Sequence, residues 1–181
     1  MLFLAVWFFL PAGIANVMPI FAAHLPIIKK FSYPIDGYKT FRGKRIFGDH
    51  KTVRGFVVGV IFAILIVFTE QLIYNHFIEI RNLVRLNYSM INPFVLGMLL
   101  ALGALGGDAI KSFFKRQITI QPGKSWFPFD QLDYIIGGIL LSVLYIRLSI
   151  MEYGVIIILW FLIHIISTSI GYLLKLKNSP L

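Results

Sequence analysis

The side chains best suited to phosphate chemistry directly follow a long apolar segment. If this segment continues as a helix through Arg116, then Asp108, Lys111, Ser112 and Lys115 stand at positions i, i+3, i+4 and i+7. These positions share one face of an α-helix. The face would carry a carboxylate, two cations and a hydroxyl in one row, a set suited to binding a phosphate together with a metal ion.

Two further carboxylates open the next apolar segment. Asp130 and Asp133 are three residues apart, so they share one helix face, and the dipole at a helix start favours negative charge. With Asp108 they predict an oxygen-rich site for Mg²⁺, a hard ion that often shares carboxylates with substrate phosphates. The alternative is structural, since lysines anchor spans and aspartates cap helices. That alternative does not explain Asp108, which is costly beside an apolar segment unless it is paired.

A second basic stretch, "PIDGYKTFRGKRIFGDHKTVRG" at residues 34–55, is interrupted by glycines. Backbone N–H groups and basic side chains of such a loop can surround phosphate groups. The alternative is a solvated loop whose positive charge only sets the membrane topology. A loop with that role does not need so many glycines, and we therefore favour a binding function.

The triplet Gly123-Lys124-Ser125 resembles the end of a phosphate-binding P-loop. The P-loop pattern requires a glycine five residues before Gly123, and position 118 is isoleucine. Pro122 precedes the triplet, and no strand pattern leads into it. We interpret the triplet as a turn, in which Lys124 remains a candidate phosphate contact.

Membrane-spanning helices must position these residues. Of the 181 residues, 58% are hydrophobic and 14% are charged, whereas about one quarter of a soluble domain is charged. Mean hydropathy is +0.82, and several apolar runs are long enough to cross a hydrocarbon core of about 30 Å. We predict an all-α, polytopic membrane protein with one domain over residues 1–181. Its five spans are expected near residues 1–25, 55–74, 90–110, 132–146 and 153–174.

The N-terminal segment "MLFLAVWFFL" lacks the positive region of a signal peptide, so we interpret it as a retained first span. Asn16, near Pro19 in this span, either lines a polar interior groove or bonds across helices. Close packing between helices is predicted by the small residues of the third span, which are Gly97, Gly103, Gly106 and Gly107.

The distribution of charge predicts which side of the membrane each loop faces. The formal net charge is +9, and most lysines and arginines fall in the loops 26–54 and 111–131 and in the C-terminal tail. The opposite connections hold Arg81, Arg85 and Arg147. The positive-inside rule then places the N-terminus outside, the C-terminus in the cytoplasm and the charged site at the cytoplasmic face of the cell membrane.

Composition also excludes several functions. In a membrane protein the basic excess indicates anionic lipid head groups or a polyphosphate substrate rather than nucleic acid. The chain has no cysteine, which excludes disulfides, thiolate zinc sites and a cysteine nucleophile. The oligomeric state is left open by the sequence.

Three blocks of the sequence resemble the CDP-archaeol synthase family, the membrane CTP-dependent cytidylyltransferases of archaeal lipid synthesis, which are related to phosphatidate cytidylyltransferase. The blocks are "ANVMP" at 15–19, the loop 34–55, and "GDAIKSFFKRQITIQPGKSWFPFDQLDY" at 107–134. The last block is the most specific, because G-D-x-x-x-S-x-x-K-R followed by D-x-x-D is similar to the wider cytidylyltransferase signature. That signature usually has arginine where this chain has Gln131.

The resemblance implies one reaction. CTP and a lipid glycerol phosphate, such as 2,3-di-O-geranylgeranylglyceryl phosphate, would give a CDP-archaeol-type lipid and pyrophosphate, with Mg²⁺ required. Asp108, Asp130 and Asp133 would hold the metal, and the catalytic set would also include Lys111, Lys115 and Arg116 as phosphate contacts. Further nucleotide and lipid-phosphate contacts would come from Asn16, Arg42, Lys44, Asp49, Lys51, Thr52, Arg54, Ser112 and Lys124.

Two other classes of membrane protein share some of these features. A CDP-alcohol phosphotransferase needs D-G-x-x-A-R, but after Asp36 and Gly37 the chain continues to Thr40 and Phe41, so we exclude this class. The remaining alternative is a small transporter or channel with a cytoplasmic cation or phosphate site. Such a protein would carry charges deep in its spans and toward both faces, whereas the charges of this chain cluster near one face.

Overall fold

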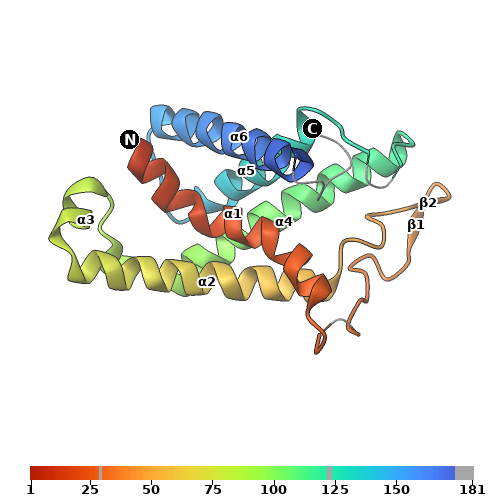
Figure 1. Cartoon of the computed structure of the whole chain (residues 1–181), viewed down its shortest axis with the longest axis horizontal. Helices are drawn as coiled ribbons and strands as arrows, with labels where there is room; N and C mark the ends of the chain where they lie inside the picture. The colour runs from red at the N-terminus through yellow and green to blue at the C-terminus, as the bar shows by residue number, and fades with distance from the viewer. Residues whose placement is uncertain (29, 122–123, 174–181) are drawn as a thin grey trace.

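The computed structural model describes residues 1–28, 30–121 and 124–173, and this part of the chain is mostly helical (Figure 1). One two-stranded hairpin and one 3-10 turn interrupt the helices, so the all-α prediction holds apart from a short β segment. The elements in chain order are α1 (Leu2–His24), β1 (Thr40–Phe41), β2 (Lys44–Arg45), α2 (Val53–His76), α3 (Ile78–Leu83), the 3-10 turn Tyr88–Met90, α4 (Pro93–Gln117), α5 (Phe129–Ser142) and α6 (Ile150–Leu173).

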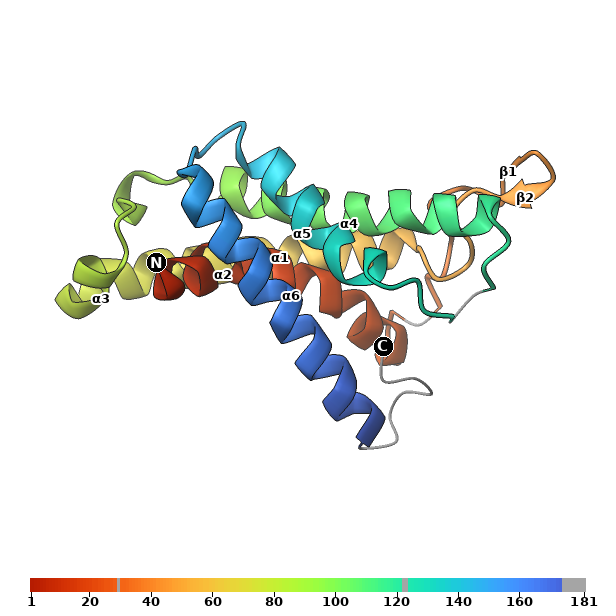
Figure 2. The same ribbon diagram turned by 90° about the horizontal axis from the view of Figure 1, so that it is seen from above.

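Four of these helices, α1, α2, α4 and α6, are long and apolar enough to cross a membrane, counting the described residues alone. The predicted fourth span corresponds to α5, whose 14 residues extend about 21 Å and so fall short of a hydrocarbon core. Successive long helices point in opposite directions along the long axis of the molecule (Figure 1). These helices are α1, α2, α4, α5 and α6. The loop between α1 and α2 and the loop between α4 and α5 therefore lie at one end, and α3 lies at the other. Seen from above, α6 crosses the others at an angle and extends outward (Figure 2).

Side chains cap the starts of α4 and α2. The carboxamide of Asn92 accepts hydrogen bonds from the N–H groups of Phe94 (3.0 Å) and Val95 (3.4 Å), and Pro93 follows at the first helical position, where a missing N–H costs nothing. At the start of α2, the hydroxyl of Thr52 accepts from Gly55 N–H at 3.2 Å. As predicted, α4 continues unbroken past Asp108 to Gln117, so its charged side chains share one face.

Glycines bring α4 and α5 into backbone contact. A Cβ atom on Gly103 would lie 2.3 Å from the carbonyl oxygen of Gly137, and one on Gly107 would lie 2.2 Å from that of Asp133. Gly97 approaches the backbone of Ile64 in α2 in the same way, so close packing is confirmed at three of the four predicted positions. It is wrong for Gly106, where an added Cβ would meet nothing within 4 Å, because this residue faces away from both helices.

The loop between α1 and α2 is organised around one buried carboxylate. Asp36 accepts hydrogen bonds from the backbone N–H groups of Tyr38 (3.1 Å), Phe47 (3.0 Å) and Gly48 (3.1 Å), and Arg45 Nη2 donates to it at 2.8 Å. Burial alone would raise the pKa of Asp36, but the bonds from Arg45 and the three N–H groups lower it to about 2. This loop is therefore an ordered unit built on its own polar contacts.

A tight hairpin within the loop explains part of its glycine content. Strands β1 and β2 pair Thr40 with Arg45 and Phe41 with Lys44, and the two residues between them both have positive φ, 51° at Arg42 and 74° at Gly43. Positive φ at both central positions matches the right-handed twist of a hairpin. The glycine serves the turn.

Candidate functional site

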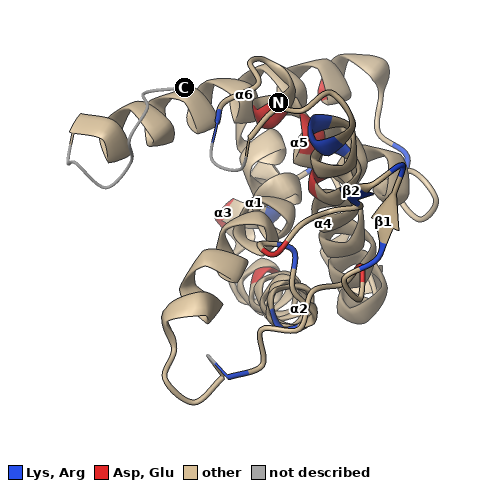
Figure 3. Cartoon of the chain, turned by 90° about the vertical axis from the view of Figure 1, so that its right-hand side faces the viewer, with Lys and Arg blue, Asp and Glu red and all other residues tan. Residues whose placement is uncertain are grey.

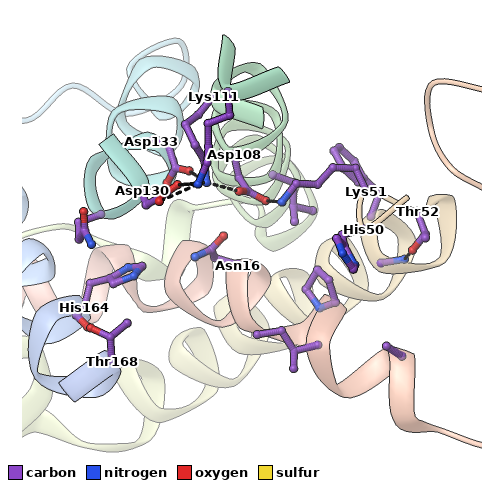
Figure 4. A pocket seen from close by; sticks show the side chains of 18 of the residues that line it. Asn16, His50, Lys51, Thr52, Asp108, Lys111, Asp130, Asp133, His164 and Thr168 are labelled. Atoms are coloured by element: carbon purple, nitrogen blue, oxygen red, sulfur yellow. Dashed lines mark hydrogen bonds and ion pairs between the residues drawn. The ribbon is translucent and has the colours of Figure 1, made fainter. Parts of the chain in front are cut away.

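A cavity of about 640 Å³ opens at the end of the bundle that holds the two basic loops (Figure 4). Its walls come from α1, the start of α2, α4, α5 and α6, together with the loop residues before α2 and before α5. Nine of the predicted site residues line it: Asn16, Lys51, Thr52, Asp108, Lys111, Lys115, Lys124, Asp130 and Asp133. Viewed onto this end, Figure 3 shows basic and acidic residues around α4, α5 and the hairpin.

The ammonium group of Lys111 lies at the centre of three carboxylates. Its Nζ is 3.1 Å from Asp108 Oδ1, 2.7 Å from Asp130 Oδ1 and 2.9 Å from Asp133 Oδ2. The side chains of all four residues are at most 18% exposed. Backbone contact between α4 and α5 makes this arrangement possible, because it brings the aspartates of α5 within reach of the α4 face that carries Asp108 and Lys111.

Lys115, one turn further along α4, extends the cluster toward the loop before α5. Its Nζ donates to Asp130 Oδ2 at 2.9 Å and to the carbonyl oxygen of Lys124 at 2.6 Å. Asp130 also accepts from the N–H of Trp126 at 2.5 Å. Asp130 is thus held by two lysines and a backbone donor, which keeps its charge compensated in a half-buried position.

Lys51 links the first loop to this cluster. It forms an ion pair with Asp108, on the side of Asp108 that faces away from α5 (Figure 4). The loop ends are drawn together by backbone bonds from Ile35 N–H to Lys51 O (2.8 Å) and from Val53 N–H to Tyr33 O (2.9 Å). Lys51, His50 and Thr52 therefore enter the cavity from a fixed strand-like segment.

The opposite wall of the cavity carries polar groups, of which sequence reasoning had assigned only Asn16 to the site. Asn16 from α1 and His164 and Thr168 from α6 face the carboxylates (Figure 4), and Gln131 lines the same space from α5. Of the two interpretations of Asn16, the position in a polar groove is the one observed. A detectable signal existed in α6, where His164 and Thr168 are four residues apart, and so on one face, of a mostly apolar helix.

The other predicted site residues lie outside the cavity and make contacts elsewhere. Lys44 Nζ donates to the carbonyl oxygen of Gln117 at 2.7 Å, at the C-terminus of α4, and Asp49 pairs with Arg45 at 2.6 Å. Ser112 donates to the Asp108 carbonyl at 2.8 Å, within its own helix. Two arginines bind backbone oxygens: Arg54 Nη1 donates to Ile28 O at 3.2 Å, and Arg116 Nη1 to Ile120 O at 3.1 Å.

Arg42 is exposed and its guanidinium lies 5.3 Å from the ring centre of Phe41. The predicted turn at 122–125 lies partly outside the described residues, since Pro122 and Gly123 are not among them. Its described members, Lys124 and Ser125, both line the cavity.

The ligand atoms around Lys111 are of the type that a hard cation prefers, because carboxylate oxygens of three residues converge on one positively charged atom. As they stand, no group of three or more His, Cys, Asp or Glu side chains in the described ranges is arranged to hold a metal ion. The lysine ammonium occupies the point on which these oxygens converge.

Helices of membrane-spanning length around a cavity of paired carboxylates and lysines define an integral membrane protein with a charged site at one end of its helical bundle. Residues 1–181 match the family described as CarS-like, CDP-archaeol synthase. A CDP-archaeol synthase of Pyrobaculum islandicum is 34% identical over 98% of this chain and 96% of its own, and one of Methanospirillum hungatei is 41% identical over 81% and 89%. The chain belongs to the CDP-archaeol synthase family.

A solved structure supports the same relationship at the level of the fold. The protein, described as an intramembrane enzyme for archaeal membrane lipid biosynthesis, superposes on this chain with a TM-score of 0.72. The match covers 90% of this chain and 91% of the other, at 26% sequence identity. A helical, intramembrane architecture is therefore common to both.

Proposed function

We propose that the cavity is the active site at which the cytidylyl group of CTP is transferred to a long-chain lipid glycerol phosphate. Family membership makes the chain an enzyme, a CTP-dependent cytidylyltransferase of archaeal lipid synthesis. The products would be a CDP-archaeol-type lipid and pyrophosphate. Family membership also favours this activity over a small transporter or channel.

The observation that carries the proposal is the cluster of three carboxylates and three lysines in one cavity. Lys51, Lys111 and Lys115 reach it from the first loop and from α4, and each is paired with Asp108 or Asp130. Positive charge from two different elements is what a triphosphate and a second phosphate monoester require when they bind next to each other. The carboxylates keep the lysines in position before the substrates bind.

The chemistry requires little more than positioning. An oxygen of the lipid phosphate attacks the α-phosphorus of CTP, a new P–O bond forms, and the bond to the β-phosphate oxygen breaks to release pyrophosphate. The nucleophile is already an anion at neutral pH, so no strong general base is needed. The lysines would bring two anions together and neutralise charge that accumulates on the leaving pyrophosphate, the main sources of rate in such transfers.

Asp108, Asp130 and Asp133 are the residues that would hold Mg²⁺. When bound, the ion would neutralise phosphate oxygens of CTP. The same oxygens accept either an ammonium group or a metal ion, and the ion pairs of Lys111 keep the carboxylates together while no metal is bound.

The cavity would face the cytoplasm. Both basic loops lie at its end of the bundle (Figure 1), and basic loops are retained on the cytoplasmic side. CTP would then reach the cavity from the aqueous phase.

A direct assay tests the proposed activity. The purified protein in detergent should transfer label from CTP labelled at the α-phosphate to a long-chain glycerol phosphate when Mg²⁺ is present, and it should release pyrophosphate in equal amount. ATP in place of CTP should give much less product. If no lipid phosphate of a panel with ether- and ester-linked chains becomes labelled, the proposal is wrong.

A further inference from the structure

Three helices meet at the inner end of the charged cavity, in a junction to which the proposed chemistry gives no role. Ala15 of α1, Ala63 of α2 and Ala101 of α4 are fully buried there in one cluster. Gly59, one turn before Ala63, faces the same junction, because a Cβ on it would lie 2.9 Å from the carbonyl oxygen of Ala15 and 2.9 Å from Leu105 Cδ1. We propose that Gly59 is a positioning residue, whose missing side chain sets the distance between the α1 wall of the cavity and the charged wall on α4.

Pro19 determines which group of α1 faces Gly59. Proline has no N–H, so Pro19 removes the donor that the carbonyl of Ala15, four residues earlier, would have within the helix. That carbonyl oxygen is the α1 atom nearest to a Cβ on Gly59. One turn earlier in α2, a Cβ on Gly55 would lie 2.9 Å from Pro19 Cβ. The start of α2 therefore lies in close contact with this part of α1, and a side chain on either glycine would separate the two helices.

The two neighbours of Gly59 would respond differently to an added methyl group. Leu105 Cδ1 is the end of a flexible side chain, which can rotate away. The Ala15 carbonyl is backbone, so it can move away only if α1 moves. On its other side α2 is fixed to α4, because a Cβ on Gly97 would lie 2.6 Å from the Cα atom of Ile64. A methyl group on Gly59 is therefore expected to shift α1 rather than α4.

A shift of α1 at this junction changes the cavity directly. Asn16 follows Ala15 in the chain, and Asp108 follows Leu105 by three residues, a rise of about 4.5 Å along α4. Both polar side chains line the cavity, and Asn16 faces the carboxylates across it (Figure 4). The width of the cavity between its two walls thus depends on how closely α1 approaches Gly59.

The inference rests on the proposed function for the identity of the ligand. A nucleotide that contacts both walls binds less tightly when the walls move apart. The ion-paired groups Lys111, Lys115, Asp130 and Asp133 belong to α4 and α5, and they keep their arrangement when α1 shifts. The expected signature is therefore a change in KM for CTP with little change in kcat.

Gly59→Ala tests the junction with a single methyl group. We expect KM for CTP to rise at least about ten-fold while kcat stays within about three-fold of the parent value, since displacements of about 1 Å have effects of this order. Gly97→Ala is the matched control, because its methyl group also enters a tight contact of α2, but about 16 Å along α4 from Asp108. Both variants should unfold at a lower temperature than the parent, and only Gly59→Ala should change KM.

A measurement without turnover checks the same point. The CTP concentration that gives half of the maximal thermal stabilisation, with Mg²⁺ and no lipid, should rise in Gly59→Ala and stay at the parent value in Gly97→Ala. If the parent is active and both variants have the same KM for CTP, the role of Gly59 is rejected and the proposed function stands. If the parent neither binds CTP nor transfers label from it, the proposed function is rejected and this inference with it.

A second variant keeps the inference testable if Gly59→Ala does not fold. Ala63→Val adds two methyl groups to the same cluster, one turn further from the cavity, where Ala63 packs with Ala15 and Ala101. KM for CTP should rise in the same direction as in Gly59→Ala, by a smaller factor. A lowered unfolding midpoint with an unchanged KM would overturn the role of the junction.

Discussion

In the loop before α2, the carboxylate of Asp36 is enclosed by N–H groups and an arginine of the same loop, whereas the carboxylates of α4 and α5 face a shared cavity. Both regions are rich in charge. In the loop, the ion pairs of Arg45 with Asp36 and Asp49 hold one segment together. At the ends of α4 and α5, Lys111 joins residues of two helices, and Lys51 joins the loop to them. Charge density alone thus does not identify a site, while charges that meet from different elements around a cavity do.

The strongest test of this difference removes a carboxylate that faces the cavity. Asp108→Asn should lower the rate of CDP-lipid formation by about 10²- to 10³-fold, because it removes the carboxylate that holds Lys51, takes one of three carboxylates from Lys111 and removes a candidate metal ligand. The rate is measured with labelled CTP in detergent micelles. Glu79→Gln serves as the control, since Glu79 is exposed on α3 at the far end of the molecule. Similar rates for both variants would remove Asp108 from the site.

The second test asks whether Lys111 has the structural role that its three partners indicate. Lys111→Met leaves three carboxylates facing one another, and removal of one partner from a buried ion pair costs about 3 kcal/mol or more. We expect a clear fall in the thermal unfolding midpoint, partly reversed by millimolar Mg²⁺. Lys39→Met, at an exposed loop lysine, should unfold like the parent. If Mg²⁺ raises the unfolding midpoint of Lys111→Met no more than that of the parent, then Mg²⁺ does not bind at the position that the Lys111 ammonium occupies.

The third test concerns the contact that brings the two helices together. Gly103→Ala places a methyl group 2.3 Å from Gly137 O, and relief of this overlap requires α4 and α5 to separate, at a cost of about 1–3 kcal/mol. Stability should fall by this amount, and activity should fall with it, because Asp108 and Lys111 move away from Asp133. Gly154→Ala, with free space around its Cβ, should leave the unfolding midpoint at or above that of the parent. An unchanged Gly103→Ala protein would show that the seam does not position the site.

The smallest effect is expected in the loop, as a change with pH. The pKa of Asp36 is about 2 in the folded loop and near 4 in an unfolded chain, so the carboxylate stabilises the loop above pH 4 and loses this contribution as pH falls through about 2. Amide exchange at Phe47 and Gly48, corrected for intrinsic rates, should stay slow down to pH 4 and become faster below it. Asp36→Asn should exchange faster than the parent above pH 4, where the parent carboxylate is ionised. A protected loop at pH 2 would show that other contacts hold it.

The sequence predicted the charged faces of α4 and α5 because helical periodicity alone places Asp108, Lys111 and Lys115 together. The lengths of the apolar segments likewise predicted the helical membrane architecture, whereas the orientation deduced from the charge distribution stays a prediction. The partner of each charged side chain in the first loop could not be predicted. Lys44 and Asp49 acquire their partners only when the loop folds and contacts α4. The carboxylates were predicted as metal ligands, and the central place of Lys111 among them depends on the distance between α4 and α5. That distance is set by the glycines Gly103 and Gly107, whose partner in α5 the sequence does not reveal.

The glycine seam has a consequence for motion. Helices whose backbones touch cannot slide or tilt against each other without breaking those contacts, so the contacts of Gly103 with Gly137 and of Gly107 with Asp133 favour motion of α4 and α5 as one unit. Any change in the width of the cavity between substrate entry and product release must then come from the facing elements: α1 with its two internal prolines, the loop that ends at Lys51, and the outward-leaning α6. The wall that carries Asp108, Asp130 and Asp133 would stay fixed throughout the catalytic cycle, while the opposite wall opens and closes over it.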